Sequence, residues 1–139
     1  MRRNAPRTGQ VATLHLPCRH DRLPRIRELV RHFCEAAGLS AAKTARFVMA
    51  VDEACSNVIE HGYGGSVDAG HLAFHPGLDL TIRQHRKAVS VTIKDYAPAF
   101  DPHQHKPVTP RELVEKGLHR GLGLYIIRTF ADSASYNRQ

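Results

Sequence analysis

The sequence predicts an α+β fold, a two-layer α/β sandwich of helices and antiparallel strands. Between residues 21 and 61, apolar residues recur at helical spacing, whereas between residues 78 and 93 they alternate with polar residues. Alternation of this kind is typical of antiparallel strands with one solvated face. The helical and strand-like segments are partly segregated along the chain, which argues against a doubly wound parallel sheet. Neither of the common glycine-rich nucleotide motifs, G-x-G-x-x-G after an opening strand or G-x-x-x-x-G-K-[ST], is present.

Length and composition are those of one globular domain. The chain has 139 residues, of which 42% are hydrophobic, and we expect a single domain over residues 10–139 after a flexible basic segment, residues 1–9. No apolar run approaches the roughly 18 residues that span a bilayer, and no apolar segment follows the N-terminal arginines as in a secretory signal. The odd number of cysteines, without metal-ligand spacing, predicts free thiols in a reducing cytoplasm. They are Cys18, Cys34 and Cys55.

The net charge of +7, with a pI near 9.8, raises the hypothesis of nucleic-acid binding. The arginines are nevertheless spread along the first helix and the tail, no aromatic residues interleave with them, and no helix-turn-helix or zinc-finger pattern is present. A basic solvated surface is therefore the favoured interpretation. An acidic protein partner or a nucleotide would be attracted by the same field.

The first half of the chain predicts a strand and two helices. Residues 11–16 alternate as a short strand. Asp21 is the expected N-cap of the first helix, which Gly38 ends in the C′ position. Ser40 is the expected N-cap of a long second helix, which ends in the glycine-rich residues 61–65.

The second half predicts strands, a long loop and a short helix. Residues 78–82 and 89–93 are two antiparallel strands joined by a hairpin turn at 85–87. Residues 96–112 contain four prolines and predict a long loop, of the kind that serves as a functional lid or is disordered. A short apolar helix follows Gly123, and residues 133–137 are a candidate last strand.

The first chemical motif lies on the second helix. Glu53 and Asn57 are four residues apart, so they share one helix face beside the apolar stripe. An amide oxygen with waters can hold Mg²⁺, and a carboxylate one turn away can orient or deprotonate a nucleophile. Alone, the pair is equally compatible with a solvated acidic face.

Two further motifs follow. Asp95 ends a strand and precedes small residues, so its carboxylate could accept a hydrogen bond from an exocyclic amine while a flat ring approaches the backbone. Residues 117–123 are glycine-rich and lead into a helix, an arrangement that can cradle phosphate, with Arg120 able to pair with phosphate oxygens. Each motif alone also fits an ordinary turn. His103 and His105 are expected to be solvated, and Cys55 is expected to be a core thiol.

The three motifs together, in this order, resemble the N box, G1 box and G2 box of the Bergerat-fold ATPases, the histidine-kinase-like superfamily. The short length, the wording DEACSNVIEHGY and the Phe-Asp-Pro after Asp95 look most like the bacterial anti-sigma factor serine/threonine kinases of partner-switching systems. The resemblance covers residues 11–136. It implies a mixed, mostly antiparallel sheet with helices on one face, and ATP and Mg²⁺ as cofactors. It also implies transfer of the γ-phosphoryl group to a serine of an antagonist protein, sequestration of a sigma factor, and a homodimer.

The resemblance also implies roles for particular residues. Glu53 would be the catalytic carboxylate, Asn57 the Mg²⁺ ligand, Asp95 the contact to the adenine amine, and residues 101–116 the ATP lid. The remaining nucleotide-binding candidates flank Asp95 or belong to the glycine-rich stretch: Ala97, Ala99, Gly117, Arg120, Gly121, Leu122, Gly123 and Leu124.

The chain departs from the family pattern in two ways. Ala97 and Ala99 stand where the wider superfamily has glycines, and a methyl group at the first position is expected to crowd the adenine. The family has one more strand than is visible before Gln139, so either the chain is truncated or its sheet is one strand short. The alternative to a kinase is therefore a non-catalytic module that binds a regulator and has a weakened ATP site.

Overall fold

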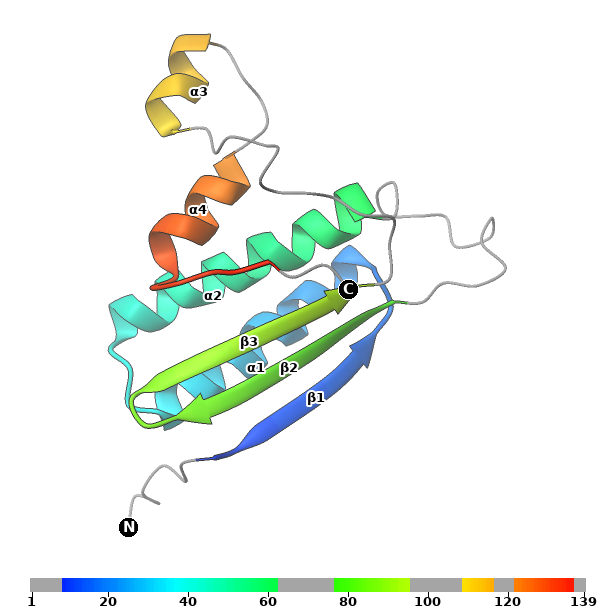
Figure 1. The fold of residues 1–139 in the computed structure, drawn as a ribbon, viewed down its shortest axis with the longest axis vertical. Coiled ribbons are helices and arrows are strands. Elements are labelled where there is room, and N and C mark those ends of the chain that lie inside the picture. Colours follow the sequence, from blue (N-terminus) through cyan, green and yellow to red (C-terminus); the bar gives the residue numbers. More distant parts are fainter. Residues whose placement is uncertain (1–8, 63–76, 96–108, 117–121, 137–139) are drawn as a thin grey trace.

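A computed structural model of the chain describes residues 9–62, 77–95, 109–116 and 122–136. Its elements follow the order β1 (Val11–Leu16), a 3-10 turn η1 (His20–Arg22), α1 (Leu23–Ala36), α2 (Ala41–Asn57), a π turn η2 (Val58–Gly62), β2 (Leu78–His85), β3 (Ala88–Asp95), α3 (Pro110–Lys116) and α4 (Leu122–Phe130). Figure 1 shows α1 and α2 together on one side of the sheet, with α4 beside α2. The predicted α+β fold with helices on one face is confirmed.

The sheet of the described residues has three antiparallel strands in the order β1-β2-β3. The register places Leu14 opposite Leu80 and Leu80 opposite Ile93, so one row of apolar side chains crosses all three strands on the helix side. Alternation leaves His15, Asp79 and Lys94 in a row on the other face. This pattern is the one that the period of two in the sequence predicts.

The core lies between the sheet and the two long helices. Leu80 and Ile82 of β2 are fully buried, as are Val30 of α1 and Cys55 of α2. The predicted apolar stripe of α1 is confirmed, and α1 ends as expected because Gly38 has a φ of 80° that favours glycine. The Ser40 side chain accepts a hydrogen bond from the backbone N–H of Lys43, which confirms Ser40 as the N-cap of α2.

The expected N-cap at Asp21 is wrong. The 3-10 turn η1 leaves Arg22, which has helical backbone angles, at the cap position of α1, and no side chain caps this helix. Asp21 instead forms an ion pair with Arg19, with 2.8 Å between Oδ2 and Nη2. Its carboxylate is therefore directed back along the chain rather than at the helix.

Two other expectations need correction. The predicted loop ends before residue 110, because Pro110 begins α3 and Thr109 Oγ1 accepts a hydrogen bond from the N–H of Glu112. Residues 133–136 form no strand. Three of the four are serine or alanine, which offer little apolar surface to hold the segment on a sheet, and Tyr136 is exposed. The predicted flexible basic segment, residues 1–9, lies outside the described residues except for Gly9.

Candidate nucleotide site

The centre of the site is the face of α2 that carries Glu53 and Asn57. Both side chains are partly buried, and both lie beside the first turn of α4. The contact is tight at Gly123: a Cβ placed on this glycine would lie 2.9 Å from Glu53 Oε2 and 3.4 Å from Asn57 Oδ1. The structure therefore brings together three residues that the sequence selected from two separate motifs.

The position of Gly123 follows from helix packing. Leu124 and Ile127 of α4 are buried, so this face of the helix is held against α2. With the face fixed, Gly123 is the point at which the α4 backbone passes the polar residues of α2. Leu122 begins α4, and the buried side chain of Leu124 leaves only its backbone to face a ligand.

The local geometry of α2 changes immediately after Asn57. The α-helix ends at this residue, and residues Val58–Gly62 continue as a π turn. Single π turns are rare and are found disproportionately at functional sites. Asn57 is thus held by regular helix on its N-terminal side and by a wider turn on the other.

Glu53 lies in an acidic neighbourhood. Burial, and then the charges of Asp52 and Glu60, raise the pKa of Glu53 above its ordinary value. A carboxylate with a raised pKa is a better proton acceptor from a hydroxyl group than an ordinary one, because basicity rises with the pKa. The arrangement favours Glu53 as a general base or an orienting group.

Asp52 belongs to the structural surroundings of the site. Its Oδ1 accepts a hydrogen bond from Nη1 of Arg27 at 2.8 Å, which ties α2 to α1. Sequence reasoning missed this pair, because residues 27 and 52 share no sequence motif that would have identified it.

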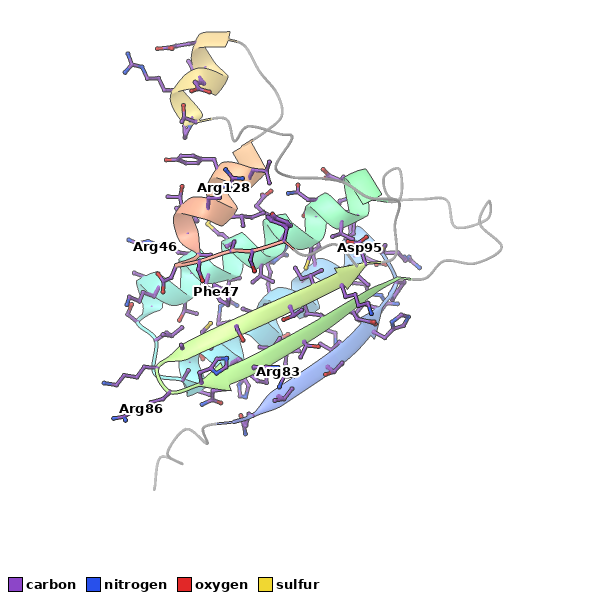
Figure 2. All side chains as sticks on the ribbon, in the orientation of Figure 1. Arg46, Phe47, Arg83, Arg86, Asp95 and Arg128 are labelled. Atoms are coloured by element: carbon purple, nitrogen blue, oxygen red, sulfur yellow. The ribbon has the colours of Figure 1, made fainter. Side chains whose placement is uncertain are left out.

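Asp95 lies on the helix side of the sheet at the end of β3. It is paired in register with Leu78, which is opposite Leu16, and both leucines face the helices. Because directly opposed residues share a face, the Asp95 carboxylate extends the row that contains Val91 and Ile93. In Figure 2 it lies at the end of the sheet toward which the C-terminal half of α2 runs.

An electrostatic link joins Asp95 to the core below α2. Burial and the charge of Asp95 raise the pKa of the Cys18 thiol to about 11. Burial, then the charge of Asp52 and then Cys18 raise the pKa of the Cys55 thiol to about 12. Cys55 is fully buried and lies between Glu53 and Asn57 in sequence. It is a core thiol, as expected, and its raised pKa makes it a poor nucleophile.

The donor set suits ATP with Mg²⁺. Among the described residues, no group of three His, Cys, Asp or Glu side chains could hold a metal ion by itself. Mg²⁺ that is bound with a nucleotide needs only one or two protein ligands, because phosphate oxygens and waters complete its shell. The amide oxygen of Asn57 fits that requirement, and the first turn of α4 at Gly123 offers backbone N–H donors that suit phosphate.

The other candidate residues lie outside the described part of the chain. They are Ala97, Ala99, Gly117, Arg120 and Gly121, together with His103 and His105 of the predicted lid. Their predicted roles remain predictions.

None of the helices in the described segments combines the length and the apolar character of a membrane-spanning helix.

Comparison with known proteins agrees with this arrangement. The family described as the histidine kinase-like ATPase domain matches residues 16–139. The chain belongs to this family. The resemblance to the Bergerat-fold ATPases, drawn from the three motifs, is thereby confirmed.

Two relatives carry kinase names. The serine/threonine-protein kinase BtrW of Bordetella bronchiseptica is 31% identical over 100 residues, which cover 72% of this chain and 66% of that protein. The serine-protein kinase RsbW of Bacillus licheniformis is 22% identical over 130 residues, covering 91% of this chain and 77% of that protein. The match therefore spans just under two thirds of the length of the Bordetella relative.

Proposed function

We propose that this histidine kinase-like ATPase domain binds ATP with Mg²⁺ and acts as an anti-sigma regulatory factor with protein serine/threonine kinase activity. In this proposal it phosphorylates a serine of an antagonist protein, sequesters a sigma factor and forms a homodimer. The observation that carries the proposal is the contact between Glu53, Asn57 and Gly123. The kinase names of the two relatives support the same activity.

Each residue has a separate task in this proposal. The amide oxygen of Asn57 holds Mg²⁺, and the Asp95 carboxylate accepts a hydrogen bond from the adenine amine. The N-terminus of α4 directs its backbone N–H groups at phosphate oxygens. Bound Mg²⁺ supplies neutralisation of the phosphate charge, which together with alignment is most of what phosphoryl transfer requires.

Glu53 acts on the incoming serine. Its carboxylate orients the hydroxyl group and accepts its proton as the serine oxygen bonds to the γ-phosphorus, while the bond from that phosphorus to the β–γ bridging oxygen breaks and ADP leaves. The raised pKa of Glu53 suits this task, and the absence of a side chain at Gly123 leaves the carboxylate room beside α4.

Transfer of labelled phosphate tests the proposal. The purified chain is mixed with Mg²⁺, γ-labelled ATP and a candidate antagonist, and label on serine is measured. We expect transfer with the wild type and its loss with Asn57→Ala, while Glu28→Gln serves as a control that neutralises an exposed carboxylate of α1 outside the proposed machinery. If Glu53→Gln transfers phosphate as fast as wild type, the role of Glu53 as base is wrong.

The alternative is a module that binds its regulator without catalysis. Ala97 and Ala99, at positions where the superfamily has glycines, favour it. Titration calorimetry with Mg-ATP and Mg-ADP separates the two functions. Absence of binding heat and of any rise in melting temperature at millimolar nucleotide would support the module over the kinase.

A further inference from the structure

A second pocket lies at the opposite end of the molecule from the nucleotide site. It is an open cavity of about 510 Å³ between the α1–α2 turn, residues 37–40, and the β2–β3 hairpin, residues 84–87. Figure 2 places Arg86 of this hairpin at one end of the sheet and Asp95 at the other. The volume falls in the range of about 300–1,000 Å³ that is usual for ligand pockets.

The pocket is basic. Lys43, Arg86 and Lys87 line it, together with His85, and no carboxylate is among its described lining residues. Over the parts of the chain that the structure describes, none of these three cations forms an ion pair. The nearest acidic residue in sequence, Glu35 on the last turn of α1, does not line the pocket. The charges of Lys43, Arg86 and Lys87 are therefore available to an anionic ligand.

The N-terminus of α2 adds to this positive field. Ser40 is the N-cap, which places Lys43 at N3, the position where glutamate would complete a capping box. A lysine there opposes the helix dipole instead of complementing it. The first turn of α2 contains no acidic residue at all. The charge of Lys43 lowers the stability of α2, which indicates that it serves to bind an anionic ligand.

A buried amide indicates what else the ligand must offer. Gln84 lines the pocket yet is only 2% exposed, so it forms the floor. Its Nε2 donates to the carbonyl oxygen of Ala36 at 3.3 Å, while its Oε1 has no hydrogen-bond partner. Thr44 Oγ1, at the same end of the molecule, is the other buried side-chain oxygen without a partner among the described residues. Because this oxygen is buried, a ligand N–H group would satisfy it only when the Gln84 side chain turns toward the pocket.

We propose that this pocket is a docking site for an acidic peptide segment of a partner protein. An extended peptide offers carboxylates to Lys43, Arg86 and Lys87 and backbone N–H groups to Gln84 Oε1. Apart from the imidazole of His85, no aromatic ring is among the described lining residues, so a stacked nucleotide base is poorly served. The site is separate from the nucleotide site and does not depend on kinase activity.

Fluorescence anisotropy without nucleotide tests the docking site. The probe is a short labelled peptide of alternating glutamate and alanine, and the same peptide with glutamine for glutamate is its neutral control. We expect Lys43→Glu and Arg86→Glu each to weaken binding of the acidic peptide by roughly tenfold or more, which corresponds to about 1.4 kcal/mol. Arg25→Glu makes the same change of charge at the far end of α1, and should weaken binding less than about threefold.

The Gln84→Met variant tests the amide separately. Methionine matches the length of the side chain but cannot accept the peptide N–H, so we expect weaker binding with an unchanged dependence on salt. Equal losses for Arg25→Glu and Lys43→Glu would overturn the proposal, because binding would then follow net charge alone. So would displacement of the peptide by inorganic phosphate at the same concentration, which would identify a simple anion site. Because nucleotide is absent, neither outcome bears on the kinase.

Discussion

The two halves of α2 carry opposite charges, and both oppose the dipole of the helix. The N-terminal half has Lys43 and Arg46, whereas the C-terminal half has Asp52 and Glu53, with Glu60 in the π turn beyond. Helices are stabilised by the reverse arrangement. Charges that reduce helix stability at both ends agree with the two proposals, a nucleotide site at the C-terminal half of α2 and a peptide site at its N-terminal half. Its stability comes from the core face with Val48, Val51 and Cys55.

The largest effect is expected at Glu53. Glu53→Gln keeps the size and a hydrogen-bonding group but cannot accept a proton, so phosphoryl transfer should fall by about 10²–10⁴-fold. Binding of Mg-ATP, measured by calorimetry, should change little. If Glu53→Gln transfers phosphate at the wild-type rate, the acidic C-terminal half of α2 has no catalytic role. The contrast between the two halves of α2 would then lose its functional meaning at this end.

Gly123→Ala should reduce activity more than stability. The new Cβ would lie 2.9 Å from Glu53 Oε2, which is the flexible end of a side chain and can move at a cost below about 1 kcal/mol. Its movement displaces the proposed base, so transfer should fall at least about tenfold.

The matched control is Gly38→Ala, which replaces a glycine with φ of 80° and no atom near its Cβ position. This variant should lose about 1 kcal/mol of unfolding free energy and keep its transfer rate. If Gly123→Ala and Gly38→Ala lost transfer rate and unfolding free energy to the same extent, the proposed site geometry would be contradicted.

The pH dependence of stability should depend on Glu53. Since its pKa is raised in the folded state, the folded chain holds this proton more tightly than the unfolded chain does. The stabilisation is complete below the unfolded pKa and is lost as pH rises through the folded pKa. At neutral pH, Glu53→Gln should therefore have a higher melting temperature than the wild type. The gain in unfolding free energy should be less than about 1 kcal/mol, because the side chain is partly exposed. The difference should vanish in acid.

The smallest effect belongs to the basic half. Lys43→Glu completes a capping box with Ser40 and should raise the unfolding free energy by about 0.3–1 kcal/mol in chemical denaturation. Arg46→Glu lies beyond the first turn and should gain less. Greater stability of the Lys43 variant, together with weaker docking of the acidic peptide, would identify a charge kept for binding.

Most of the fold can be predicted from local sequence patterns. The stripe of α1, the Ser40 cap and the hairpin with alternating Val89, Val91 and Ile93 are local patterns, and each was predicted. The start of α3 was missed although Thr109-Pro110 with Glu112 is a recognisable helix beginning. Three prolines before it favour a loop, and the fourth, Pro110, begins the helix itself. The cap at Asp21 was predicted wrongly because a 3-10 turn before a helix has no clear sequence signature.

The site was predictable only in parts. The pairing of Glu53 with Asn57 follows from helical spacing, but their contact with Gly123 depends on how α4 packs on α2, which no local pattern specifies. The same holds for the ion pair between Arg27 and Asp52. The pocket at the α1–α2 turn was not foreseen, since Lys43 and Gln84 meet there only through the tertiary fold.

The missing side chain at Gly123 offers a criterion for sorting related chains. Any sequence that carries a larger residue at this position while keeping the glutamate of α2 must shift either the glutamate or α4 to relieve the overlap. With Glu53 as the proposed base, such chains should keep the fold and transfer phosphate more slowly. The residue at this one position would then indicate which related chains hold the glutamate in the same place.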